Sequence, residues 1–167
     1  MRTKREEAKR VDKCLGITKR YYCELPAAKL NIIPHGELNQ KILGVIEEVN
    51  PDIVYTHYEN DIHMDHRIIY ESVMVSTRPI KEKKINVICF ETVSSSEWNM
   101  PHLTPNYYVD ITEFIQRKID AFLEYKSEIK QFPHPRSAEG LMVLAKKRGM
   151  EVNVQCAEAF RIVREFW

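Results

Sequence analysis

Apolar residues recur at helical spacing in some parts of the chain and form short continuous runs in others. Leu38, Ile42, Val45, Ile46 and Val49 follow the 3.6-residue period and predict an amphipathic helix over 37–49, which Asn50-Pro51 ends. Runs rich in β-branched residues predict strands over 52–56 and 85–91. Further helices are predicted over 2–15, 64–76, 112–130 and 137–148, and extended segments over 107–110 and 152–165.

This order of elements predicts the fold class. Helices alternate with strands, and the run 85–91 is almost continuously apolar, as in a strand buried on both faces. We therefore expect an α/β fold with a mainly parallel sheet. In such sheets the functional site lies beyond the carboxyl ends of the strands.

Composition narrows the function classes. Of 167 residues, 44% are hydrophobic and 29% charged, and the net charge is +1, which is ordinary for a globular domain. Basic residues are interspersed with acidic ones, so nothing indicates a nucleic-acid partner. No apolar run reaches the ~20 residues of a transmembrane segment, and residues 1–10 are too charged for a signal peptide.

The four cysteines, at positions 14, 23, 89 and 156, are widely spaced. They form no CxxC pair, so neither a disulfide framework nor a cysteine zinc site is indicated. We expect a reducing, cytoplasmic location, with Cys89 and Cys156 as small buried residues inside apolar runs.

The segment His57–Arg67 follows the first predicted strand and holds three of the six histidines. It also contains Asp61 and Asp65. Imidazole and carboxylate groups are zinc ligands, and a catalytic zinc takes three protein ligands and a water. In an HxxH pair with an intervening Asp, one His suits metal binding, the other suits proton transfer, and the Asp suits fixing a tautomer.

A purely structural role also fits this loop. An Asp near a helix start is a common cap, and His and Asp form hydrogen bonds with each other in polar loops. Composition alone favours the two interpretations about equally. His35 and His102 are expected at the surface. His134 and Arg136, in a proline-fixed loop, and Trp98 are weaker candidates for facing a substrate.

Several weak motifs in a fixed order resemble the LmbE/PIG-L family of zinc-dependent N-acetyl-sugar deacetylases. They are Glu7 with Leu15-Gly16, residues 51–57, residues 61–67, Glu91, residues 95–99, residues 105–111, Lys118, residues 125–128, residues 133–137, Arg148-Gly149 and residues 157–160. Together they span most of the chain and resemble the C-terminal two-thirds of the family domain.

The resemblance implies a three-layer, Rossmann-like fold and assigns roles by position. His66 would be a Zn²⁺ ligand, His63 would stabilise the oxyanion and protonate the leaving amine, and Asp65 would orient His63. Asp61, Trp98, His134 and Arg136 would contact the substrate, an amino-sugar conjugate such as an N-acetylglucosamine derivative. The reaction would be hydrolysis of the acetamide by a zinc-activated water.

The sequence departs from the family in one respect. Family members begin with a strand and an HPDDE-type loop that supplies the other metal ligands and the general base, and this sequence contains no such motif. We therefore expect residues 1–167 to form a single, N-terminally truncated domain. A start at an internal Met, a split gene or a non-catalytic remnant would each explain this, and we favour the first.

Two functions other than deacetylation are alternatives for this sequence. One is a non-catalytic remnant that binds a sugar or a partner chain. The other is a metallo-phosphohydrolase, which the scarcity of further grouped ligands disfavours. An open sheet edge left by a missing strand would favour a homo-oligomer.

Overall fold

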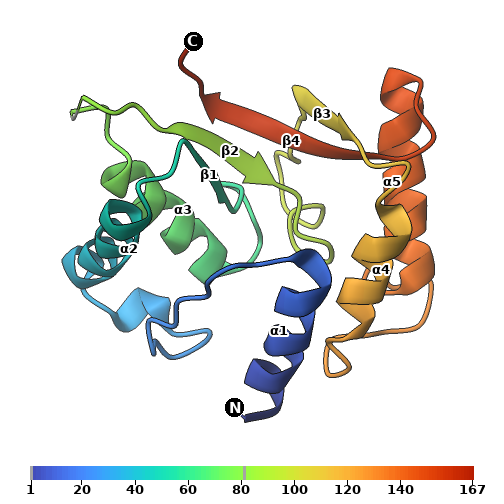
Figure 1. The fold of residues 1–167 in the computed structure, drawn as a ribbon, viewed down its shortest axis with the longest axis horizontal. Helices are drawn as coiled ribbons and strands as arrows, with labels where there is room; N and C mark the ends of the chain where they lie inside the picture. Colours follow the sequence, from blue (N-terminus) through green and yellow to red (C-terminus); the bar gives the residue numbers. More distant parts are fainter. Residues whose placement is uncertain (1, 81) are drawn as a thin grey trace. The chain divides into compact units, whose positions relative to one another are not determined.

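The computed structural model describes residues 2–80 and 82–167, which form two compact units (Figure 1). One unit comprises the chain up to Arg20 together with Tyr108–Ala159. The other comprises Tyr21–Tyr107 together with Phe160–Trp167.

The first unit is mainly helical. It contains α1 (Arg2–Leu15), α4 (Ile115–Leu123) and α5 (Ala138–Val152), and α4 packs against both of the others. Each helix buries an apolar face, as its 3.6-residue pattern predicts. The buried side chains of these helices include Ala8, Val11, Ile115, Ile119, Ala121, Leu141 and Ala145.

Helix α1 ends where the sequence indicates. Gly16 has a positive φ of 72°, and the Ile17 N–H donates to the Asp12 carbonyl over 2.9 Å. This is the glycine-terminated helix end in which a left-handed residue closes the last turn.

Helix α4 is shorter than the predicted 112–130 because a local turn precedes its start and a tertiary contact follows its end. Asp110 accepts hydrogen bonds from the backbone N–H and hydroxyl of Thr112, which forms a local turn there instead of capping the helix. Beyond Leu123, the buried carboxylate of Glu7 accepts bonds from the Ser127 N–H over 3.3 Å and hydroxyl over 3.1 Å.

The second unit holds α2 (His35–Val49), β1 (Ile53–Thr56), α3 (Met64–Ser76) and β2 (Asn86–Phe90), with a short 3-10 turn at Leu30–Ile32. Helix α3 packs on α2 and on β1 (Figure 1). The predicted helices over 37–49 and 64–76 and both predicted strands are present. Helix α2 begins two residues early, at His35, because Pro34 serves as its N-cap.

Four strands form one sheet in the order β1-β2-β4-β3, where β3 is Tyr107–Asp110 and β4 is Ala157–Arg164. β1 and β2 are parallel, and β2 and β4 are antiparallel. The Asn106 N–H donates to the Phe160 carbonyl, and the Ile111 N–H donates to the Cys156 carbonyl. The partner lies earlier in β4 as the donor lies later in the β3 segment, so β3 and β4 are antiparallel as well.

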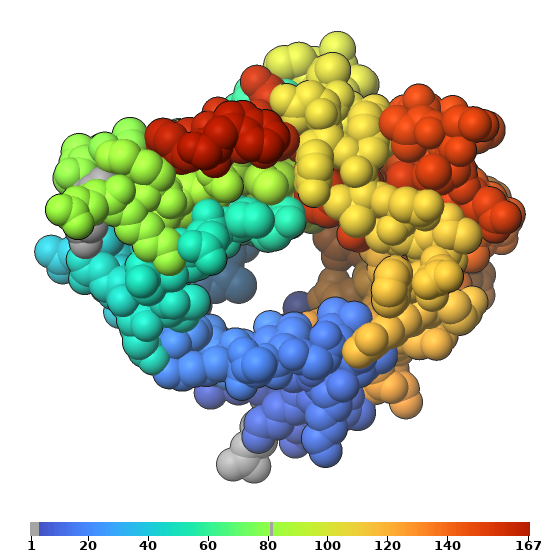
Figure 2. Space-filling view, turned by 45° about the horizontal axis from the view of Figure 1, so that its top comes forward, coloured from blue at the N-terminus to red at the C-terminus, as the bar shows by residue number. Residues whose placement is uncertain are grey.

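The prediction of a mainly parallel sheet therefore needs correction, because only one of these pairings is parallel. The pattern of 152–165 indicates an extended segment but carries no information on strand direction. Mixed sheets with antiparallel strands beside parallel ones are common in such folds. Figure 2 shows the C-terminal residues in dark red against the green segment that contains β2.

Two further sequence predictions concern membrane-spanning segments and the cysteines. Among the residues that the structure describes, no helix is long and apolar enough to cross a membrane. All four cysteines are free, and Cys89 and Cys156 are buried, as predicted.

Two glycines provide a test of packing in these helices. A Cβ at Gly149 of α5 would lie 2.5 Å from the Val154 carbonyl oxygen and 2.8 Å from that of Gln155, whereas one at Gly44 of α2 would meet open space. We expect Gly149→Ala to lower the free energy of unfolding by about 1–3 kcal/mol through overpacking. Gly44→Ala should raise it by about 0.5–1 kcal/mol through helix propensity.

Urea unfolding followed by far-UV circular dichroism measures both effects. Equal shifts in the same direction for the two variants would contradict the close approach at Gly149.

Candidate active site

The histidine-rich loop lies where two segments leave the parallel pair of strands. It follows β1 directly and leads into α3, while the segment after β2 begins at Glu91. The two segments touch: His57 Nδ1 lies 3.4 Å from Thr92 Oγ1, and the Ile62 N–H points to the Ser95 carbonyl over 3.5 Å. The site is thus at the carboxyl ends of parallel strands, as the sequence predicts.

A small apolar cluster supports this loop from inside the same unit. Tyr58, Cys89 and Leu103 are buried together, with Tyr70 and Val163 packed against them. The Tyr58 hydroxyl donates to the carbonyls of the Pro101–His102 segment, at 3.2 and 3.3 Å. The loop after β2 is therefore fixed on the histidine loop at a second point.

Asp61 is the centre of the loop's hydrogen bonding, and its side chain is fully buried. Its Oδ1 accepts from the His63 N–H over 2.8 Å and from the Ser95 hydroxyl, and its Oδ2 lies 3.0 Å from His66 Nδ1. Burial alone would raise the pKa of this carboxyl. The bonds from His66, Ser95 and the His63 backbone outweigh it and hold the pKa below its usual range.

Three imidazole rings stack beside Asp61. The His57 and His66 ring centres are 4.0 Å apart with planes 4° apart, and those of His63 and His66 are 4.5 Å apart with planes 20° apart. Burial and the neighbouring imidazoles lower the pKa of His57 to about 4. His57 is therefore neutral at physiological pH.

His63 begins α3 as its N-cap. Its Nδ1 accepts a hydrogen bond from the Asp65 backbone N–H over 3.2 Å. The Asp65 carboxylate instead accepts from the Leu30 N–H over 3.1 Å. Asp65 thus contacts His63 through its main chain, and its side chain anchors the segment before α2.

The structure brings His63 and His66 together at Asp61, and Asp65 is linked to them through its contact with His63. Asp61 itself lies beneath His66 and not at the surface. Trp98 is in the same unit, 53% exposed, on the segment that also holds Ser95.

His134 and Arg136 belong to the other unit. His134 Nδ1 accepts from the Arg136 N–H over 3.0 Å, and the Arg136 guanidinium pairs with Glu128 at 2.7 Å. Their predicted contact with substrate stays a prediction.

The sequence analysis included His57 in the histidine loop and Ser95 in a family-like motif, but it assigned neither of them a role. Both stand shortly after a strand of the parallel pair, which was the available signal: His57 follows β1, and Ser95 lies in the polar Ser-Ser-Ser-Glu run after β2. Serine is so common in loops that such a run does not distinguish a site from a turn.

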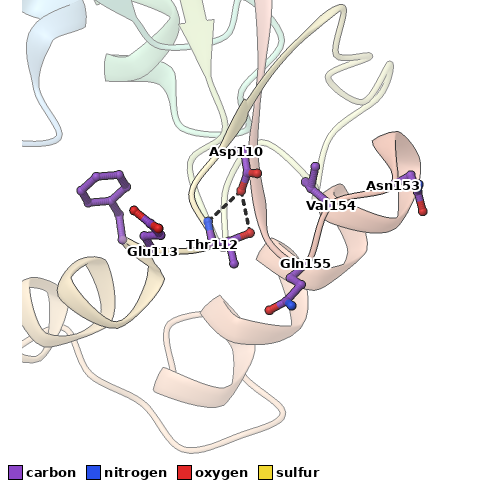
Figure 3. A pocket seen from close by; sticks show the side chains of 7 residues that line it. Asp110, Thr112, Glu113, Asn153, Val154 and Gln155 are labelled. Carbon is purple, nitrogen blue, oxygen red and sulfur yellow. Dashed lines mark hydrogen bonds between the residues drawn. The ribbon is translucent and has the colours of Figure 1, made fainter.

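A cavity of about 700 Å³ lies elsewhere, in the first unit (Figure 3). It is lined by Asp110, Thr112, Glu113, Phe114, Asn153, Val154 and Gln155. No histidine lines it, and Asp110 is bonded to Thr112 within it. The histidine loop, where buried charge and imidazoles meet, is the better candidate for chemistry.

Comparison with known proteins agrees with this choice. A family model described as PIG-L, GlcNAc-PI de-N-acetylase, matches residues 1–76, which include the whole histidine loop. Solved structures of deacetylases share the fold. The resemblance to the PIG-L/LmbE family is confirmed.

Three solved structures show the extent of the shared fold. A conserved protein of Thermus thermophilus has 19% identity and a TM-score of 0.80, over 99% of this chain and 75% of that protein. The N,N'-diacetylchitobiose deacetylase of Pyrococcus horikoshii has 21% identity and a TM-score of 0.74, over 96% and 63%. A zinc-inhibited form of teicoplanin deacetylase has 14% identity and a TM-score of 0.69, over 98% and 74%.

The PIG-L/LmbE-like site fits zinc only in part. His66 presents one imidazole whose far nitrogen is turned from Asp61, as in a metal ligand oriented by a carboxylate. Over residues 2–80 and 82–167, however, no three His, Cys, Asp or Glu side chains are grouped to hold a metal ion. The planes of the stacked rings are nearly parallel, so the in-plane lone pairs of their nitrogens do not converge on one ion.

The neutral state of His57 gives a pH-dependent stability. The unfolded histidine takes up a proton near pH 6.5, but the folded one does so only near pH 4. Between these values the unfolded state binds more protons, so stability falls as the pH falls through this window. The free energy of unfolding changes by roughly 3 kcal/mol over this window, at about 1.36 kcal/mol per unit of pKa difference.

We expect His57→Gln to flatten the curve of unfolding free energy between pH 6.5 and 4, measured by urea unfolding. His35→Gln, at an exposed histidine of α2, should keep the wild-type slope. Parallel curves for His57→Gln and the wild type would contradict the burial of a neutral His57.

Proposed function

We propose that this chain carries part of the active site of a zinc-dependent hydrolase that removes the acetyl group from an N-acetylglucosamine-like amino sugar. The observation that carries the proposal is the buried Asp61 carboxylate against His66 Nδ1, with His63 stacked on the same ring. The PIG-L family match and the deacetylase names of the structural relatives support it.

In this proposal His66 is one metal ligand through Nε2. Zinc in such enzymes polarises a carbonyl and lowers the pKa of its bound water. The described residues group no set of three metal ligands, so His66 is the one ligand that this proposal assigns.

His63 is proposed to handle the proton. Since its Nδ1 accepts from the Asp65 N–H, the neutral ring carries its proton on Nε2. That N–H is a donor for the oxyanion that develops on the acetyl oxygen, where such a bond has its largest effect. The same nitrogen is the natural source of the proton for the leaving amine.

The substrate contacts are proposed from exposure and chemistry. Trp98 offers an exposed aromatic face for a sugar ring. His134 and Arg136 belong to the other unit, and their contact with a substrate is proposed only from the donors that their side chains carry. β1 is at an edge of the sheet with Ile53 and Tyr55 exposed, which favours a homo-oligomer. Four free cysteines suit a cytoplasmic location.

The alternative is a non-catalytic chain that binds a sugar or a partner through the same loop. The incomplete ligand set favours it. A metallo-phosphohydrolase would need several grouped carboxylates, and the described residues group none.

Zinc binding tests the metal role. We expect zinc that is titrated into the chain to bind. His66→Ala should weaken the zinc affinity at least about tenfold, because even the loss of a residue that only supports a metal ligand costs about that much. Chelator competition measures this. His35→Ala is the matched control at an exposed histidine, and equal weakening in both variants would overturn the role of His66.

Acetate release separates the enzyme from the alternative. With N,N'-diacetylchitobiose and zinc, we expect acetate release that falls about 10²–10⁴-fold in His63→Ala, the range for loss of a general acid. Sugar binding by saturation-transfer NMR without acetate release would favour the non-catalytic chain. Release of phosphate from a phosphate ester, without acetate, would overturn the deacetylase.

A further inference from the structure

The Nδ1 atom of His66 faces two oxygen atoms. One is Asp61 Oδ2 at 3.0 Å, and the other is Ser95 Oγ at 3.5 Å. Oδ2 is buried without a hydrogen bond of regular geometry, and Ser95 Oγ is at hydrogen-bond distance, so a proton on Nδ1 has two oxygen acceptors within 3.5 Å. What each oxygen can do decides where that proton resides.

Both oxygens are acceptors toward His66. Asp61 acts as an acceptor, because it already receives the His63 N–H and the Ser95 hydroxyl on Oδ1. Ser95 has one hydroxyl hydrogen, and it is directed at Asp61 Oδ1. Only the lone pairs of Ser95 Oγ remain for His66, so an unprotonated Nδ1 would face two acceptors at once.

Ser95 is held in place by its own segment. Its side chain is buried, and its N–H donates to Glu97 Oε2 over 2.8 Å, while the Ser94 N–H donates to Glu97 Oε1 over 2.5 Å. Ser94 has a φ of 61°, a left-handed conformation that costs a non-glycine residue roughly 1–2 kcal/mol. The Glu97 carboxylate compensates for this cost by binding both N–H groups.

We propose that Ser95, held by Glu97, is a positioning residue that acts with Asp61 to fix neutral His66 as the Nδ1–H tautomer. The Nε2 lone pair is then always presented outward as a base or a metal ligand. The use of that lone pair in catalysis rests on the proposed function, whereas the tautomer does not.

The neighbouring ring has the opposite tautomer. His63 accepts at Nδ1 from the Asp65 N–H, so its proton is on Nε2. Two stacked imidazoles thus present different groups, a lone pair from His66 and an N–H from His63. His63 provides an internal reference for the measurement.

Long-range ¹H–¹⁵N correlation spectra of the ¹⁵N-labelled chain, with chelator and at about pH 8, report the tautomer of each neutral histidine. We expect His66 to be protonated on Nδ1 and His63 on Nε2. Ser95→Ala should shift the His66 tautomer ratio toward Nε2–H by about fivefold, the effect of one net hydrogen bond.

Ser96→Ala is the matched control, because Ser96 is equally buried in the same loop but bonds to Thr92. It should leave the His66 ratio unchanged. If Ser95→Ala does not fold, Glu97→Gln, at an exposed position, should shift the ratio in the same direction.

A wild-type His66 protonated on Nε2 would overturn the proposal. So would an unchanged ratio in folded Ser95→Ala, or in Glu97→Gln where Ser95→Ala does not fold. Neither metal nor substrate enters the measurement, so its failure is distinct from failure of the deacetylase assay.

Discussion

A fully buried carboxylate needs hydrogen-bond donors, and the groups around Asp61 come from the start of α3 and from the segment after β2. The His63 N–H comes from its own loop, the Ser95 hydroxyl from the segment after β2, and the His66 ring from α3. Leaving any of these unmade would cost the desolvation of a buried charge. The arrangement of the site is therefore a consequence of satisfying one side chain.

The same bonds determine the chemistry that the site offers. Asp61 holds His66 in place, His66 packs between His57 and His63, and burial keeps His57 uncharged. A neutral His57 leaves the stack without the repulsion that two adjacent imidazolium rings would have. His63 is exposed and His66 is half-buried, so both rings can be reached by a ligand.

Tertiary contacts changed local predictions at identifiable points. Helix α4 stops at Leu123, although the pattern continues, because Glu7, distant in sequence, accepts both donors of Ser127. β4 lies antiparallel beside β2, although its sequence fits either direction. In both cases the local pattern is compatible with several outcomes, and a partner far along the chain selects one.

The sequence by itself determined the positions of α2, α3, β1 and β2, the placing of the histidine loop at the carboxyl end of a strand, and the PIG-L/LmbE resemblance. It did so because hydrophobic period and turn residues act over a few positions. Only the tertiary structure decided strand direction, the main-chain contact of Asp65 with His63, and the approach of His57 and Ser95 to His66. Strand direction and the Ser95–His66 approach depend on atoms that are 29 or more residues apart, which no local pattern encodes. The Asp65–His63 contact and the His57–His66 stack depend on how the loop backbone turns, which the residue types alone do not determine.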